Sequence, residues 1–360
     1  RLDQAAIFPH VAREHNSKFP PEEILRSLLH LLSDTAGAEY LFSSEFFGAA
    51  SVYEPTLHKT LNAVTDFVKS LISSNTDVIS LLLCARLTEK IRLKLLSRHI
   101  QCLDPFFLNL SMIIWPQFKR SIDDHCASLT KTPIFLPPSL HVHIITQRYA
   151  RLLCTFVALA EGDSILVTSS MQLRKDVQKY LEKCSTTLQK SEDRAVFLLN
   201  NYAEILALLL TVGGGKVSAE YVYFEEQQNA QLAVFVEEQL GRMFGSMIDF
   251  VRRCEPILGR DDLSPEAMVK AITDHSVEQL VMDFNRSWKG VVAKANDTIV
   301  SLFAESTLGT VALKQVFTQL LLYYSRFLEV IRKRWQHPPF ERDIVSVPSI
   351  MYEIKRYSRI

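Results

Sequence analysis

The sequence predicts an all-α protein, an elongated rod of stacked helical bundles, and three observations lead to this fold class. Apolar residues recur at intervals of three and four along most of the 360 residues, which is the pattern of amphipathic helices. Only 11 glycines and 14 prolines interrupt the chain, fewer than average usage would supply. Stretches with β-branched alternation, such as Tyr221–Phe224 and Ile344–Val347, are too short and isolated to build a sheet.

Helix boundaries are marked by prolines, glycines and capping residues. Pro133–Pro138 is expected to end one helix before Ser139 opens the next, and Gly213–Gly215 to end another. Ser264–Glu266 offers an N-cap, a first-turn proline and an acid, and therefore predicts a helix start. His337–Pro339 closes the last long helix, and about a dozen helices fit between these marks.

Three helices of five turns or more are each predicted from one apolar stripe. Trp288 lies on the second of the three stripes listed next, and we therefore expect it to be buried. The stripes run through Phe235, Val236, Leu240, Met243, Phe244, Met247, Ile248 and Val251; through Ile272, Val277, Leu280, Val281, Phe284, Trp288, Val291, Val292 and Ile299; and through Val316, Phe317, Leu320, Leu321, Tyr324, Phe327, Leu328, Ile331 and Trp335.

Two domains are predicted, a first helical bundle over residues 1–188 and a C-terminal helical bundle over residues 189–360. The polar stretch Ser185–Asp193 motivates this boundary; the alternative is a bend within one continuous helical rod. No internal repeat of the length used by solenoid proteins is found, and this argues against a helical-repeat array.

Charge excludes one class of partner and suggests two surfaces. The 40 Lys and Arg residues balance the 40 Asp and Glu residues, so the chain lacks the surplus of cations that nucleic-acid binding requires. Residues 219–241 contain glutamates without Lys or Arg and form a candidate acidic face. The C-terminal end is basic and is a candidate surface for a protein partner or an anionic membrane, the alternative being a solvated face. Its candidate residues are expected to fold beside one another: Arg332, Lys333, Arg334, Lys355, Arg356 and Arg359.

Motifs that carry chemistry are incomplete in this sequence. His10 and His15 have the wrong spacing for a shared metal ion, and His141 and His143 are expected to cap a helix or lie at the surface. Gly213–Lys216 follows a helix and lacks the Ser or Thr that a phosphate-binding loop requires. We therefore predict no catalytic, cofactor-binding or metal-binding residues. Neither Asp123-Asp124 nor Asp261-Asp262 completes the acidic cluster of all-α terpenoid enzymes.

The cellular setting is predicted from cysteines and hydropathy. The six cysteines are too widely spaced for zinc or redox motifs and are expected to be free, buried thiols in a reducing compartment. The longest apolar stretch, Ala195–Val212, contains polar residues at its centre and would be a poor membrane span. No signal peptide is predicted, and the chain is interpreted as a cytosolic fragment of a longer protein.

Four stretches resemble a known family and occur in its order: Glu39–Phe47, Ile144–Ala150, Phe197–Tyr202 and Asn285–Lys289. They are similar to the C-terminal part of the vacuolar-protein-sorting subunit fifty-two family, also called Sac2, of the Golgi-associated retrograde protein (GARP) complex. The likeness runs from about Phe19 to Ile360. The tyrosines and phenylalanines of these stretches are interpreted as core residues.

The resemblance implies a non-catalytic subunit of a multisubunit vesicle-tethering complex, acting between endosomes and the trans-Golgi network. It implies a helical rod similar to exocyst, COG and Dsl1 subunits, and assembly with other subunits through an N-terminal region missing here. SNAREs, small GTPases or anionic membrane are further partners to expect, at the cytoplasmic side of trans-Golgi and endosomal membranes. Two alternatives stay open: an α-solenoid adaptor or scaffold, and an all-α enzyme, which would need a deep pocket with convergent titratable groups.

Overall fold

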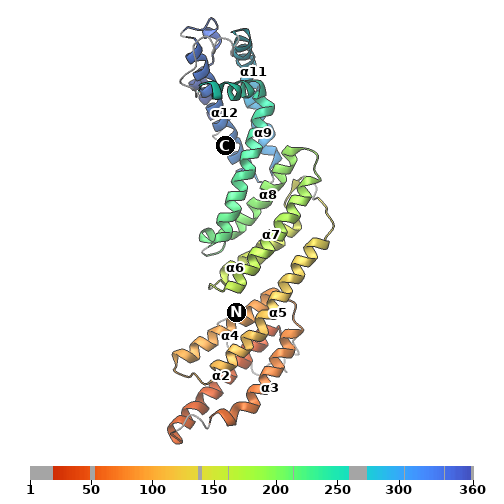
Figure 1. Cartoon of the computed structure of the whole chain (residues 1–360), viewed down its shortest axis with the longest axis vertical. Coiled ribbons are helices and arrows are strands. Elements are labelled where there is room, and N and C mark those ends of the chain that lie inside the picture. The colour runs from red at the N-terminus through yellow and green to blue at the C-terminus, as the bar shows by residue number, and fades with distance from the viewer. Residues whose placement is uncertain are drawn as a thin grey trace. The chain divides into compact units, whose positions relative to one another are not determined.

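The computed structural model describes residues 19–48, 53–136, 140–160, 162–213, 215–258, 274–303, 305–335 and 337–357. These ranges contain eleven α-helices, two short 3₁₀ helices and no β-strand, so the predicted all-α class is confirmed (Figure 1). The elements are α2 (Pro21–Phe46), α3 (Tyr53–Ser73), α4 (Val78–Ser97), α5 (Asp104–Lys131), α6 (Ile144–Ala158), α7 (Ser164–Thr186), α8 (Ser191–Leu210), η3 (Gly215–Val217), α9 (Ala219–Leu258), α11 (Asp274–Leu302), α12 (Ser306–Arg334), η4 (Glu341–Asp343) and α13 (Val347–Tyr357).

The chain divides into two compact units that are discontinuous in sequence. Unit 1 contains the described residues up to Pro133 together with Leu152–Tyr180, and unit 2 contains Ile134–Arg151 together with the chain from Leu181 onwards. The chain therefore passes from one unit to the other three times: after Pro133, within α6 and within α7. The predicted division into bundles over residues 1–188 and 189–360 stays a prediction.

Unit 1 is built on a four-helix arrangement, in which α4 packs on α2 and α5, and α3 packs on the same two helices (Figure 1). Helix α2 begins with Pro21 in its first turn, followed by Glu22 and Glu23, a sequence suited to the positive end of the helix dipole. Asp77 caps α4 by accepting a hydrogen bond from the Ile79 backbone N–H at 2.9 Å. The buried side of α2 contains Leu25, Leu29, Leu32 and Ala36.

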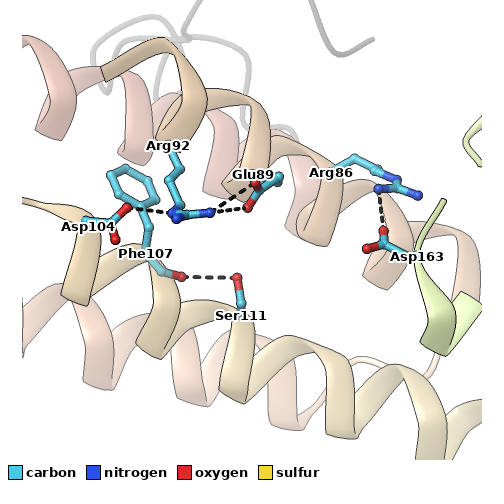
Figure 2. Close-up of polar contacts among 7 residues, drawn as sticks. All are labelled: Arg86, Glu89, Arg92, Asp104, Phe107, Ser111 and Asp163. Carbon is cyan, nitrogen blue, oxygen red and sulfur yellow. Dashed lines mark hydrogen bonds and ion pairs between the residues drawn. The ribbon is translucent and has the colours of Figure 1, made fainter. Parts of the chain in front are cut away.

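Polar contacts fix α4 against its neighbours (Figure 2). Arg92 on α4 donates to Asp104, the first residue of α5, at 2.6 Å and to Glu89 at 3.1 Å. The hydrogen bond with Asp104 is the main reason that the pKa of Arg92 is raised. Arg86, whose side chain is buried, forms an ion pair with Asp163, the residue before α7. These contacts orient the start of α5 and the start of α7.

In unit 2, α8 packs on α9, α12 packs on α9 and α11, and α13 packs on α12 and α11. The three predicted stripes form its core, and Phe235, Trp288 and Phe327 are buried as expected. Helix α9 contains one residue with non-helical backbone angles, Phe244, directly before Gly245. Helix α11 begins at Asp274, so Ile272 of the second stripe and the helix start predicted at Ser264 lie outside the described residues.

Most boundaries around the proline and glycine marks are confirmed, but the helix start predicted at Ser139 is wrong. Helix α6 begins only at Ile144, and Ser139 itself lies outside the described residues. Leu140 has a φ of 56°, which a right-handed helix does not accommodate. His143 then caps α6, because its Nδ1 accepts a hydrogen bond from the Ile145 N–H at 3.1 Å. The predicted capping role of this histidine is confirmed.

The glycine-rich segment after α8 has a packing role. Helix α8 ends at Leu210, shortly before Gly213, as predicted. At Gly215 a Cβ atom would overlap the carbonyl oxygen of Leu209, so only glycine fits this close approach. The segment continues directly into η3 and α9.

Candidate docking surfaces at the C-terminal end

The first candidate basic cluster occupies the last turn of α12. Arg332 and Lys333 are exposed and Arg334 is half-buried. Lys333 pairs with Glu329 one turn earlier at 3.1 Å, and the Arg334 guanidinium lies 4.8 Å from the centre of the Trp335 ring. Cations in this position also interact favourably with the negative end of the helix dipole. Two of the three charges therefore already have partners within the chain.

The second candidate cluster lies on α13. Ile350 and Ile354 are buried, whereas Lys355 and Arg356 are exposed in the last turn. Arg356 donates to Glu353 at 2.9 Å, and this hydrogen bond is the main reason that its pKa is raised. Arg359 lies outside the described residues.

The structure does not bring the two clusters together. The Tyr324 hydroxyl donates to the Val345 carbonyl at 2.7 Å, which places the start of α13 beside the middle of α12. The end of α13 lies farther back along α12, where Tyr357 and Leu321 line one pocket. Since Arg332 follows Leu321 by eleven residues, about 16 Å along a helix, the expectation that the clusters fold beside one another is wrong.

The acidic stretch at the start of α9 is only partly a surface. Glu225 and Glu226 are exposed. Glu237 is half-buried; it accepts hydrogen bonds from the Tyr323 hydroxyl at 3.1 Å and from Arg252 at 2.5 Å. Glu237 therefore connects α9 to α12, and the free acidic face is shorter than the sequence suggested.

The described residues offer few groups for chemistry. None of the described His, Cys, Asp and Glu side chains gather in a group of three or more that could hold a metal ion. Burial raises the pKa of both Cys84 and Cys126 to about 12, the opposite of the shift that activates a thiol nucleophile. Across the described ranges, none of the helices combines the length and the hydropathy needed to cross a bilayer.

Comparison with protein families identifies the chain. The family model described as "Vps52, C-terminal" matches residues 1–236, about two thirds of the sequence. The chain belongs to the Vps52 C-terminal family. Among its relatives, vacuolar protein sorting-associated protein 52 A of Arabidopsis thaliana is 34% identical over 99% of the chain and 50% of the relative. The Homo sapiens homologue is 25% identical over the same shares. The chain thus spans about half the length of these curated relatives.

A solved structure shares the fold of this Vps52-family chain. It comes from work on the exocyst subunit Exo70p and the Exo84p C-terminal domains. The TM-score is 0.52 with 10% sequence identity, over 94% of this chain and 71% of the other. At this identity the likeness shows a common helical fold and nothing further.

The stretch Phe197–Tyr202 has a structural role that explains its two asparagines. Asn201 is fully buried; its Oδ1 accepts from the His143 N–H at 2.9 Å and from the Thr146 hydroxyl at 2.6 Å. Asn200 donates to the Leu140 carbonyl at 3.0 Å. These two side chains hold the segment that leads into α6 against α8. The pattern of apolar residues could not predict this role of the asparagines, because their hydrogen-bond partners lie 55 to 60 positions away in the sequence.

The tyrosines and phenylalanines of the four stretches differ in burial, and Tyr40 of the first stretch is half-buried. Tyr149, Phe197 and Tyr202 are buried, so the interpretation of these rings as core residues is confirmed. For the phenylalanines of Glu39–Phe47 the same interpretation is wrong, because all three are more than half exposed. The three are Phe42, Phe46 and Phe47.

Proposed function

We propose that this chain is the C-terminal arm of a subunit of the GARP complex, a multisubunit tethering complex for retrograde transport from endosomes to the trans-Golgi network. The family membership, the names of the relatives as vacuolar protein sorting proteins and the fold shared with an exocyst structure support this proposal. The arm acts without catalysis or cofactor, together with the other subunits. It works at the cytoplasmic side of trans-Golgi and endosomal membranes.

One observation supports contact between α13 and an anionic membrane. Met351 and Tyr352 are exposed beside Lys355 and Arg356, while Ile350 and its neighbours on the opposite side pack on the core. An amphipathic aromatic ring next to cations is the composition of a membrane-interface surface. Each cation near an anionic bilayer contributes about 1 kcal/mol, less where an internal carboxylate already pairs with it. We therefore expect weak, salt-sensitive binding.

Charge reversal on α13 tests the proposal. The triple variant K355E/R356E/R359E of the full-length protein should no longer float with phosphatidylserine vesicles, and cells that carry only this variant should lose retrograde cargo retrieval. The matched control R332E/K333E reverses exposed cations on α12 and should keep both properties. Circular dichroism checks that both variants are folded.

The outcomes separate the candidate surfaces. Normal cargo sorting with the triple variant would remove α13 from consideration and leave the exposed acidic residues Glu225 and Glu226 as the next surface to test. Loss of sorting without any loss of vesicle binding would assign α13 to an acidic protein partner, whose association is also faster at low salt.

A further inference from the structure

Helix α2 carries a second apolar stripe that does not take part in the core. Its buried side packs into unit 1 through Leu25, Leu29 and Leu32. The opposite side is exposed and also follows helical spacing of three and four. The four large side chains of this stripe, and Phe47 just beyond the helix, have exposed fractions of 41–71%. The stripe consists of Leu31, Ala38, Leu41, Phe42 and Phe46.

The phenylalanine rings at the end of this stripe already pack on one another. Phe42 and Phe46 stack with ring centroids 5.3 Å apart, and Phe47 meets Phe46 edge to face at 5.0 Å. The N–H of Phe47 donates to the carbonyl of Ser43, a buried residue, which anchors the end of the helix. Rigid aromatic side chains lose little conformational entropy on binding, and such clusters are typical anchors of interfaces.

Acidic residues accompany the aromatic end of the stripe. The sequence contains no Lys or Arg between Arg26 and Lys59 but has four acids there. Of these, Asp34 and Glu45 are exposed and Glu39 is half-buried. None of these three forms an ion pair with another described residue. Asp34 lies close to His30 at the start of the stripe, so the negative charge near the rings comes from Glu39 and Glu45.

Cations of a neighbouring helix face the other end of the stripe. The pKa of His30, the residue before Leu31, is lowered by burial and then by the positive charge of Lys94 on α4, with a smaller contribution from Lys90. These lysines lie near the start of the stripe, about four helical turns from Phe46. They leave the negative character of the aromatic end in place.

We propose that the exposed stripe of α2 binds an amphipathic helix of a partner protein whose apolar side is flanked by Lys or Arg. The stripe runs about 22 Å from Leu31 to Phe46, which suits a partner helix of about four turns lying in contact with it. The acids select a basic partner. A membrane fits less well, because these carboxylates would be brought against anionic headgroups. The stripe lies in unit 1, so this surface is distinct from the basic α13 of unit 2.

Two designed peptides test the proposal against the full-length protein. Both form a helix of about five turns with the same leucine stripe, flanked by Lys in one and by Glu in the other. Fluorescence anisotropy should show that the basic peptide binds about tenfold more tightly than the acidic one. F42S/F46S should weaken binding of the basic peptide about 30-fold, and E39K/E45K should reverse the preference between the peptides. The matched control F67S removes a half-exposed ring on α3 and should change binding less than twofold.

Clear results would overturn the proposal. Equal affinity for the two peptides, or the same loss in F42S/F46S as in F67S, would show that α2 is not the binding surface. Flotation of the parent protein with phosphatidylcholine vesicles, abolished in F42S/F46S and accompanied by no preference between peptides, would assign the stripe to a membrane instead. If F42S/F46S lowers the melting temperature, L41S replaces it, since Leu41 is as exposed as Phe42 and the neutral serine leaves the charge of the surface unchanged.

Discussion

Replacing Asn201 by alanine should destabilise unit 2 more than its size suggests. The side chain is fully buried and takes part in three hydrogen bonds, two as acceptor and one as donor to the Phe197 carbonyl at 2.7 Å. Alanine removes the acceptor but leaves the His143 N–H and the Thr146 hydroxyl in place. Both donors would then lose this buried acceptor.

The expected loss follows from these two donors. A buried donor without a partner costs about 1–3 kcal/mol. The backbone N–H of His143 cannot turn away, so its cost lies in the middle of this range. The Thr146 hydroxyl can rotate towards the backbone carbonyls three and four residues earlier, just before α6, so its cost lies at the lower end. With the small cavity that alanine leaves, the free energy of unfolding should decrease by about 3 kcal/mol.

Urea unfolding and hydrogen exchange measure this loss. The exposed Asn62 side chain bonds to the His58 side chain one turn earlier at 3.2 Å, so N62A is the matched control and should change the unfolding free energy by less than about 0.5 kcal/mol. Amide exchange of His143 should accelerate in N201A and not in N62A. If the two variants unfold at the same urea concentration, or if the His143 amide keeps its protection, the assigned role of Asn201 is wrong.

Three further predictions concern burial. W288A should lower the unfolding free energy by about 3–5 kcal/mol, because Trp288 is 3% exposed, while K289A at the exposed neighbouring position should be nearly neutral in denaturant melts. D163A should destabilise more than D123A in thermal melts, since Asp163 pairs with a buried guanidinium and Asp123 with an exposed ammonium; equal melting temperatures would contradict this. The Cys84 thiol, with its pKa raised by burial to about 12, should react with iodoacetamide near pH 8 only after unfolding. Because the folded state keeps this proton between pH 9.0 and about 12, stability should fall as pH rises through that window.

Local patterns predicted the long helices well. The stripes on α9, α11 and α12 could be recognised because one side of each helix is continuously apolar, and rings such as Phe235 and Phe327 are buried on that side. The helix ends near Pro133, Gly213 and His337 also follow from residues within a few positions. These features depend on short-range geometry, which the sequence records directly.

Features that depend on distant partners could not be predicted in this way. Both sides of α2 are apolar, and periodicity alone does not say that Leu29 faces the core while Phe42 faces solvent. The direction of α13 along α12 depends on contacts such as that between Tyr324 and Val345, so the separation of the two basic clusters was missed. The late start of α6 likewise depends on Asn200 and Asn201 of another helix.

The discontinuous sequence of unit 2 has a consequence for its synthesis. Ile134–Arg151 leaves the ribosome before the last part of unit 1, Leu152–Tyr180. During translation this segment therefore lacks its hydrogen-bond partners, Asn200 and Asn201, until α8 emerges some 50 to 60 residues later. Neither unit can be completed before the first piece of the other has been made. Assembly of the two is thus interleaved in time, and a ribosome that stalls between residues 151 and 180 would leave both units incomplete.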